Sequence, residues 1–284
     1  MKSEPMKITI LVMLLANFFY VMANTQTQKT TSVTHTDGID RFCQNILESE
    51  ESFAQFRRSS FCLQMIDTLT SSLGWEFILF TSQHYPCLLP KLDGFRKNDS
   101  LGDPLLAQFG EYGIFCPTTL RYIKIAGDLE SYFGNLDQKR IIEIGGGYGG
   151  QCAILSTLFS FKEYIIVDLP EVLTLAKKYL DLLGITNVRF CSPSEVPAKM
   201  PCDLLISNYA FSECSYPTQM DYIEKILIHS QSGYMICNDF GYLSGISSLN
   251  QQTSRNAFEK KNIVIQNLPE IPLTGGSNYL LIWK

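Results

Sequence analysis

Seven short apolar runs in the second half of the chain constrain its fold more than any other feature. They follow Gly134 and alternate with stretches of helical periodicity. Strands buried on both faces have such continuous apolar sequences, and their alternation with helices predicts an α/β fold with a mostly parallel sheet. We expect strands at 140–144, 163–168, 188–191, 203–208, 233–239, 262–266 and 278–284, and helices at about 150–159, 170–183, 216–230 and 248–258.

The last two runs predict one reversed strand. Two prolines and two glycines, Pro269, Pro272, Gly275 and Gly276, fill the gap between them and leave no room for a helix. A parallel crossover needs roughly a dozen or more residues, usually a helix. We therefore expect the final strand to run antiparallel to its predecessor.

The region ahead of this sheet is expected to be helical. Apolar residues between 39 and 135 recur at helical spacing, with prolines and glycines between the groups. This pattern predicts a helical appendage or cap over 39–135, ahead of an α/β domain over 136–284. Residues 24–38 are polar and rich in Thr and Gln, which is typical of a linker.

The amino terminus resembles a secretory signal. Lys2 and Lys7 precede an apolar stretch that ends at the small residues Val21 and Ala23. The stretch is shorter than the roughly 20 residues that span a bilayer comfortably, so cleavage of 1–23 is favoured over an uncleaved membrane anchor. Either interpretation places the rest of the chain outside the cytoplasm, secreted or in the lumen of the secretory pathway.

Export would expose a sequence pattern for glycosylation. Asn98 begins the tripeptide Asn-Asp-Ser, a pattern that can accept a glycan in a eukaryotic secretory pathway. We therefore consider Asn98 a candidate glycan acceptor.

Nine cysteines occur in the chain, an odd number without the spacings typical of zinc sites. We expect neither a full disulfide framework nor a cysteine-based zinc site. Four cysteines fall on or beside predicted core elements and are expected to be free: Cys152, Cys191, Cys202 and Cys237. The others are candidates for pairing, with partners left open: Cys43, Cys62, Cys87, Cys116 and Cys214.

Composition excludes two classes of protein. The 284 residues are 45% hydrophobic and 18% charged, which is ordinary for a globular fold and excludes a disordered chain. The net charge is −5, and Lys and Arg do not cluster among aromatic residues, so a nucleic-acid partner is not expected.

A glycine-rich turn, "IIEIGGGYGGQCAILS" at 141–156, joins the first predicted strand to the first helix. Glycine tolerates the positive φ of a tight turn and lets the backbone approach a ligand at a helix amino terminus. Gly145, Gly147 and Gly150 match the dinucleotide pattern G-x-G-x-x-G. Glu143 with Gly145, Gly147 and Gly149 matches E-x-G-x-G-x-G, the pattern of class I S-adenosylmethionine methyltransferases.

Two carboxylates and the reversed strand favour the second cofactor. Glu143 can accept hydrogen bonds from the amino acid part of S-adenosylmethionine, whereas its charge would repel phosphates. Asp168 ends the next strand, where a carboxylate accepts the ribose hydroxyls of either cofactor class. The expected antiparallel ending also resembles the methyltransferase sheet. We therefore expect S-adenosylmethionine as the cofactor.

Four segments extend this resemblance to one family. They are "NDSLGDPLLAQFGEYGIFCPTTLRYIKIAGDLESYFG", "IIEIGGGYGGQCAIL", "YIIVDLPEVLTLAKKYL" and "LLISNYAFSEC". Together they resemble the sugar O-methyltransferases, a branch of the class I fold, from about Asn98 to the carboxyl terminus. The resemblance implies methyl transfer to the hydroxyl of a small-molecule sugar or a glycan.

The cofactor residues follow from this pattern. Asn208 and Tyr209 end the fourth predicted strand and are expected to border the transferred methyl group. Ser192, with Ser194, either binds the adenine edge or forms a plain turn around Pro193. The remaining assignments are Glu143, Gly145, Gly147 and Gly149 for the amino acid end, Asp168 for the ribose and Leu169 for the adenine face.

Three residues are candidates for the proton acceptor. Glu213 and Asp239 follow the fourth and fifth strands and can act as proton acceptors or metal ligands, although Glu213 can instead cap the next helix. His84 belongs to the helical region, which can deliver it to the acceptor or leave it as a surface histidine. Four further residues either line the pocket or pack the helical region onto the sheet: Tyr112, Thr118, Arg121 and Tyr122.

Two other functions remain open. S-adenosylmethionine is made in the cytosol, so an exported enzyme needs imported cofactor. This conflict raises the alternative of an exported binding protein that kept the methyltransferase fold without turnover. A nicotinamide-dependent oxidoreductase is the third hypothesis, and it depends on Gly145, Gly147 and Gly150 alone.

Overall fold

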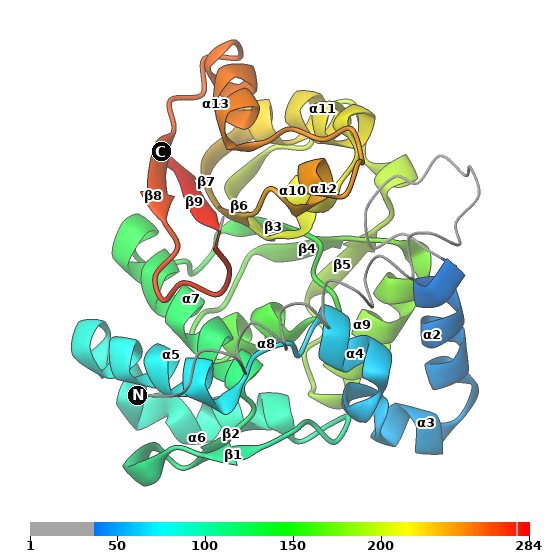
Figure 1. The fold of residues 1–284 in the computed structure, drawn as a ribbon, viewed down its shortest axis with the longest axis vertical. Helices are drawn as coiled ribbons and strands as arrows, with labels where there is room; N and C mark the ends of the chain where they lie inside the picture. Colours follow the sequence, from blue (N-terminus) through cyan, green and yellow to red (C-terminus); the bar gives the residue numbers. More distant parts are fainter. Residues whose placement is uncertain (1–36, 277) are drawn as a thin grey trace, which may run out of the picture. The chain divides into compact units, whose positions relative to one another are not determined.

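The computed structural model describes residues 37–276 and 278–284, and its main feature is a seven-stranded sheet in the order β5-β4-β3-β6-β7-β9-β8 (Figure 1). Neighbouring strands are parallel except where β9 pairs with β7 and β8. The expected α/β, Rossmann-like fold with a reversed final strand is thereby confirmed. The strands are β3 (Arg140–Ile144), β4 (Glu163–Val167), β5 (Val188–Cys191), β6 (Cys202–Asn208), β7 (Ser230–Cys237), β8 (Gln266–Pro269) and β9 (Tyr279–Trp283).

Two predicted boundaries differ most from the structure. The strand expected at 262–266 begins only at Gln266, because the chain leaves the preceding helix through a turn in which Asn262 has φ +62°. The helix expected at 216–230 ends at Lys225, and a 3-10 turn leads into β7 at Ser230.

Helices cover both faces of the sheet, and the alternation of side chains along the strands decides which helices they meet. Ile141 and Ile206 face the core formed with α7, α8 and α9, whereas Ile142 and Leu205 face the core formed with α11 and α13. These helices are α7 (Pro117–Phe133), α8 (Gly150–Ser156), α9 (Pro170–Leu182), α11 (Tyr216–Lys225) and α13 (Gln251–Glu259).

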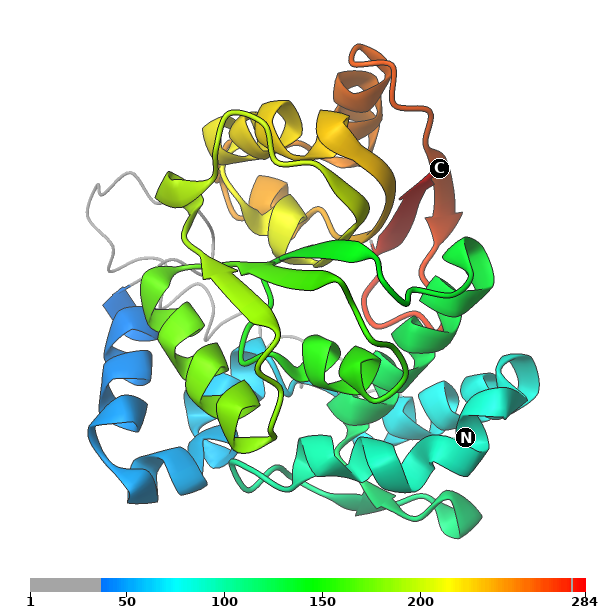
Figure 2. The same cartoon turned by 180° about the vertical axis from the view of Figure 1, so that it is seen from behind.

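The region ahead of the sheet is helical, as expected, and shares the first of these cores. α5 contacts α7, and α2 contacts α9 (Figures 1 and 2). α7, which was predicted as part of the appendage, is buried along most of its length and belongs to the layer that covers the sheet. The remaining elements are α2 (Asp37–Glu48), α3 (Glu50–Ala54), α4 (Ser60–Met65), α5 (Ser71–His84), α6 (Leu92–Phe95) and a small hairpin of β1 (Ala107–Gln108) with β2 (Ile114–Phe115).

The predicted signal or anchor, residues 1–23, and most of the linker lie outside the described residues. α2 begins at Asp37, so the last two residues of the predicted linker are helical. Within the described part of the chain, no helix has both the length and the apolar character needed to cross a bilayer.

Two predictions about modification have different outcomes. All nine cysteines are free, which confirms that a disulfide framework is absent, and each of them except Cys87 is buried. Asn98, the candidate glycan acceptor, is not accessible in the folded chain, because this residue is only 2% exposed. Its side-chain amide donates to Thr119 Oγ1 at 2.8 Å, and its Oδ1 accepts from Tyr179 Oη at 3.0 Å.

Candidate functional site

The glycine turn after β3 has the backbone that its sequence predicts. Gly145, Gly147 and Gly149 have φ of +78°, +54° and +93°, which side chains rarely adopt. A Cβ on Gly145 would lie 2.0 Å from the Cβ of Ala210, so this glycine also permits the close approach of the chain after β6. Gly149 precedes the first residue of α8 as its N-cap.

Glu143 lies beneath this turn, near the end of β3. It is 1% exposed, and its Oε2 accepts a hydrogen bond of 2.8 Å from Tyr164 Oη. Burial raises the pKa of Glu143 to about 8, because removal from water disfavours the charged carboxylate, and the nearby charge of Asp168 acts in the same direction. A cationic ligand group nearby would favour the charged form.

Asp168 faces the glycine turn from the end of β4. Its Oδ2 accepts from the Gly147 amide at 3.0 Å, and its Oδ1 accepts from the Leu169 amide at 2.8 Å. Burial raises its pKa to about 6, against the effect of these two hydrogen bonds. The structure therefore brings Asp168 and the turn together, as the sequence predicted.

The predicted adenine residues lie at the same edge. Leu169 is the N-cap of α9 and packs partly buried against the core. Ser192 follows β5, but its hydroxyl contacts Glu195 Oε2 at 2.7 Å and Ser194 Oγ at 3.1 Å. Ser192 and Glu195 form a capping box around the turn, which is the structural alternative that the sequence left open.

Asn208 and Tyr209 end β6 beside the glycine turn. Asn208 Oδ1 is buried and has no hydrogen-bond partner in the described part of the chain. Tyr209 has φ +70°, a strained conformation for a bulky residue, and such strain is concentrated at functional sites. Its hydroxyl donates to Glu270, a buried carboxylate in the loop before β9.

Glu213 and Asp239 come from the chain after β6 and β7. Glu213 ends the short helix α10 (Ala210–Glu213), and its Oε1 accepts from Asn238 Nδ2 at 3.1 Å. Burial raises the pKa of Glu213 above its usual range. Asp239 is the N-cap of α12 (Phe240–Leu243), and its Oδ1 accepts from the Gln251 amide at 3.0 Å. Each candidate thus accepts one hydrogen bond, and the raised pKa of Glu213 suits a proton acceptor.

His84 is not placed with these carboxylates. It is exposed at the end of α5, and its ring lies 4.2 Å from that of Phe80. The adjacent Tyr85 donates to Asp128 Oδ1, about two helical turns beyond Arg121 on α7. The helical region thus holds His84 away from the turn, which favours the surface alternative.

Two buried residues at the site were missed from sequence. Gln151, in the first turn of α8, is 1% exposed, and its Nε2 donates to the Tyr122 carbonyl at 3.2 Å. It is the polar residue in an otherwise apolar helix start, and that contrast was a usable signal. Glu270 accepts from Tyr209, Thr274 and Asn278, and nothing in its Pro- and Gly-rich surroundings predicted these contacts.

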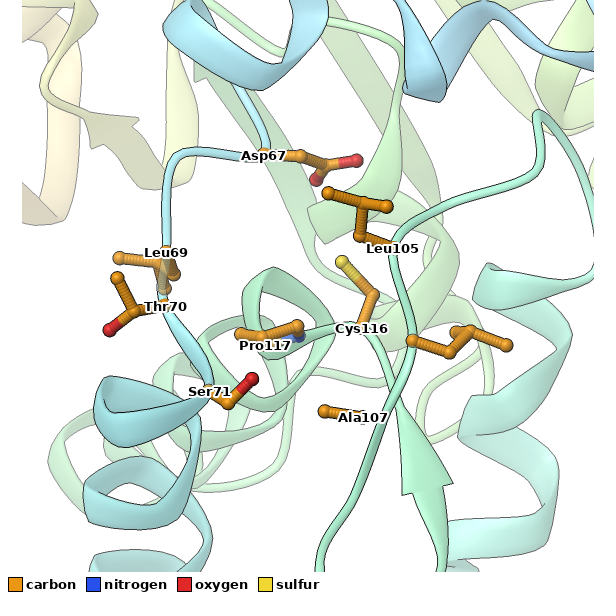
Figure 3. Close-up of a pocket in the computed structure, with 9 residues that line it drawn as sticks. Asp67, Leu69, Thr70, Ser71, Leu105, Ala107, Cys116 and Pro117 are labelled. Carbon is orange, nitrogen blue, oxygen red and sulfur yellow. The ribbon is translucent and has the colours of Figure 1, made fainter.

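A pocket of about 310 Å³ lies at the start of α7 (Figure 3). Asp67 and Ser71, Leu105 and Cys116 border it from three separate segments. The segment carrying Asp67 also reaches the glycine turn, since Ile66 Cδ1 lies 3.9 Å from the position of a Cβ on Gly147. No group of three or more His, Cys, Asp or Glu side chains suited to a metal ion occurs among the described residues.

Comparison with known proteins finds similarity only to solved structures. No protein-family model matches the chain, and none of the curated proteins matches it. A protein described as a sarcosine dimethylglycine methyltransferase from Galdieria sulphuraria has 14% identity and a TM-score of 0.44, over 53% of this chain and 64% of that one. This chain thus spans slightly less than two thirds of that protein.

Two further solved structures are S-adenosylmethionine-dependent methyltransferases. The one from Clostridium acetobutylicum has 11% identity and a TM-score of 0.43, over 52% of this chain and 84% of that one. The one from Aquifex aeolicus has 16% identity and a TM-score of 0.41, over 56% of this chain and 88% of that one. Similarity at this level leaves the reaction and its acceptor to be inferred from the residues of this chain.

Proposed function

We propose that this chain is an S-adenosylmethionine-dependent methyltransferase. The observation that carries the proposal is the junction after β3. The chain runs from β3 through β4 to β5 on one side and then returns to β6 on the other, so β3 and β6 border the crevice where open α/β sheets bind ligands. Glu143, the glycine turn, Asp168 and Asn208 all lie at this edge.

Each part of the junction suits a part of the cofactor. The Asp168 carboxylate can accept both ribose hydroxyls, and the positive-φ glycines let the backbone approach the ligand. A bound sulfonium or ammonium group favours the charged form of Glu143, which then supplies negative charge beside it and offers none of the attraction that a pyrophosphate needs. These features favour S-adenosylmethionine over a nicotinamide dinucleotide.

The reaction we propose is an in-line methyl transfer to oxygen. The hydroxyl oxygen of the acceptor forms a bond to the methyl carbon, the carbon–sulfur bond breaks with its electron pair going to sulfur, and the hydroxyl proton goes to a protein carboxylate. Positioning two ligands in this geometry is worth roughly 7 to 11 kcal/mol, and a general base about 10²- to 10⁴-fold. Glu213 is our first candidate for the base, ahead of Asp239.

We propose a sugar or glycan hydroxyl as the acceptor. The support is the sequence resemblance to sugar O-methyltransferases and the pocket at the start of α7. Asp67, Thr70 and Ser71 offer that pocket polar groups beside apolar side chains, a combination that suits a sugar ring. We also propose export of the chain through its amino-terminal segment, which sequencing of the mature amino terminus would test.

Calorimetric titration of the full chain with S-adenosylmethionine, S-adenosylhomocysteine and NAD tests the cofactor. We expect binding of the first two, loss of at least about 10-fold in affinity on Asp168→Asn, and no change on Asp181→Asn, a matched control in an exposed ion pair on α9. Binding of NAD alone would support the oxidoreductase. Binding of none of the three would leave the exported binding protein.

A further inference from the structure

Three buried polar atoms at this edge have no hydrogen-bond partner in the described part of the chain. They are Arg121 Nε on α7, Gln151 Oε1 on α8 and Asn208 Oδ1 at the end of β6. Arg121 is 7% exposed and Gln151 is 1% exposed. Buried polar atoms are nearly always paired, so three unpaired atoms at one edge of a sheet indicate a missing ligand.

The contacts of neighbouring residues bring these three side chains together. The Arg121 guanidinium carbon lies 5.4 Å from the ring centre of Tyr209, which directly follows Asn208. The same carbon lies 5.4 Å from the ring centre of Tyr122, whose carbonyl accepts from Gln151 Nε2. Because Nε2 is used in this way, Gln151 Oε1 is the atom left to receive a donor.

The charge of Arg121 has no close counter-charge. Within the described residues, no carboxylate lies at ion-pair distance from its guanidinium; Glu270, which accepts from Tyr209, attracts it from farther away. The side chains beside it are the rings of Tyr122 and Tyr209. Burying a charge without a close counter-charge costs stability, so the arrangement suits an anionic group that arrives with a ligand. The amide oxygens of Gln151 and Asn208 suit a group with hydrogen-bond donors instead.

One cationic donor beside two carbonyl acceptors is the complement of a zwitterionic α-amino acid. We propose that Arg121 binds the carboxylate of the methionyl end of S-adenosylmethionine, and that Gln151 and Asn208 accept hydrogen bonds from its ammonium group. This inference rests on the proposed function and deepens it. It places the amino acid end against α7 and α8, with Glu143 beneath as a source of negative charge.

Paired ligands separate this inference from the proposed function. S-adenosylhomocysteine carries the amino acid end, whereas methylthioadenosine has the nucleoside without it. For Arg121→Met we expect the Kd of S-adenosylhomocysteine to rise at least about 10-fold, and that of methylthioadenosine to change less than about twofold. Gln151→Met should act in the same direction with a smaller effect. Arg58→Gln, in an exposed ion pair with Asp103, is the matched control and should change neither.

The outcomes are distinguishable. If the native chain binds neither ligand, the proposed function is wrong. If it binds both and Arg121→Met leaves the Kd of S-adenosylhomocysteine unchanged, the nucleoside site stands and the amino acid receptor is wrong. A second measurement needs no variant: decarboxylated S-adenosylmethionine should bind the native chain at least about 10-fold more weakly than S-adenosylmethionine, and equal binding of the two overturns the inference.

Discussion

Two arginines of this protein are both buried, yet their surroundings differ. Arg57, in the helical region, donates from Nε to Asp67 Oδ2 at 2.7 Å and from an η nitrogen to the Asn98 carbonyl at 2.8 Å. The same η nitrogen lies 3.2 Å from Asp99 Oδ1, and the guanidinium lies over the ring of Tyr148. Arg121, at the sheet edge, has two aromatic neighbours and no carboxylate at ion-pair distance within the described residues.

The difference separates a structural charge from a charge kept for a ligand. Arg57 joins three segments whose partners satisfy it, so its network holds the helical region against the glycine turn through Tyr148. Arg121 keeps an unpaired Nε beside the crevice where β3 and β6 end. The same residue type therefore stabilises the fold in one region and, on our proposal, costs stability in the other until a ligand binds.

Removal of the first arginine should have the largest effect. Arg57→Met leaves Asp67 and Asp99 buried without their cation, so we expect the free energy of unfolding to fall by about 3 to 5 kcal/mol in denaturant titrations. For the matching Arg121→Met we expect the free energy of unfolding to fall by less than about 1 kcal/mol or to rise, because no buried carboxylate loses an ion-pair partner. Equal losses for the two variants would contradict the comparison.

The glycine turn allows a second test of what the sheet edge requires. Gly145→Ala adds a Cβ that meets Ala210 at 2.0 Å in a backbone of φ +78°, so we expect a loss of about 3 kcal/mol in the free energy of unfolding. Gly134 has a similar φ of +74° with nothing within 4 Å of its added Cβ. Gly134→Ala should therefore cost only about 1 kcal/mol, from backbone strain alone.

The effect of Glu143 on stability should decrease with rising pH, whereas a carboxylate in a structural ion pair stabilises the fold as pH rises. Its pKa is raised by burial to about 8, so between about pH 4.5 and 8 the folded state holds a proton that the unfolded state has lost. Stability therefore falls as pH rises through this window. Glu143→Gln should remove this slope and increase the unfolding free energy near pH 8 by about 2 kcal/mol, measured by denaturation across pH. A variant that is less stable at pH 8 would contradict the pKa.

The smallest expected effect concerns Asp168. Burial raises its pKa to about 6, and only its carboxylate form accepts both ribose hydroxyls. The affinity for methylthioadenosine should therefore be constant above about pH 7 and fall towards tenfold per pH unit below pH 6, about 1.4 kcal/mol at pH 5. Calorimetric titration measures this dependence, and the Asp168→Asn variant should not show it.

Sequence patterns located the sheet well where strands are buried on both faces. The bounds of β3 match the prediction and β4 ends one residue early, because both strands are continuous apolar runs that are buried from their second residue onward. β8 was misplaced because its own residues are mostly polar and exposed, whereas Ile263 and Val264 before it are apolar. The position of this exposed edge strand is therefore not encoded in its hydrophobicity.

The candidate site was predictable only where a residue lies directly at a strand end. Glu143, Asp168 and Asn208 follow from the strands that precede them. Gln151 and Glu270 depend on contacts between segments far apart in the chain, with Tyr122 and Tyr209 respectively. The polar Gln151 in an apolar helix start was a local signal, whereas no local pattern marks Glu270. The same limit applies to Asn98, whose acceptor pattern carries no information on burial.

A crystal structure of the full chain with S-adenosylhomocysteine would locate both ends of the bound ligand. We expect the ribose hydroxyls at Asp168 and the carboxylate of the amino acid end against Arg121, with Gln151 Oε1 and Asn208 Oδ1 facing the ammonium group. A ligand bound away from the ends of β3 and β4, or a crevice filled by side chains with no ligand density, would contradict this expectation.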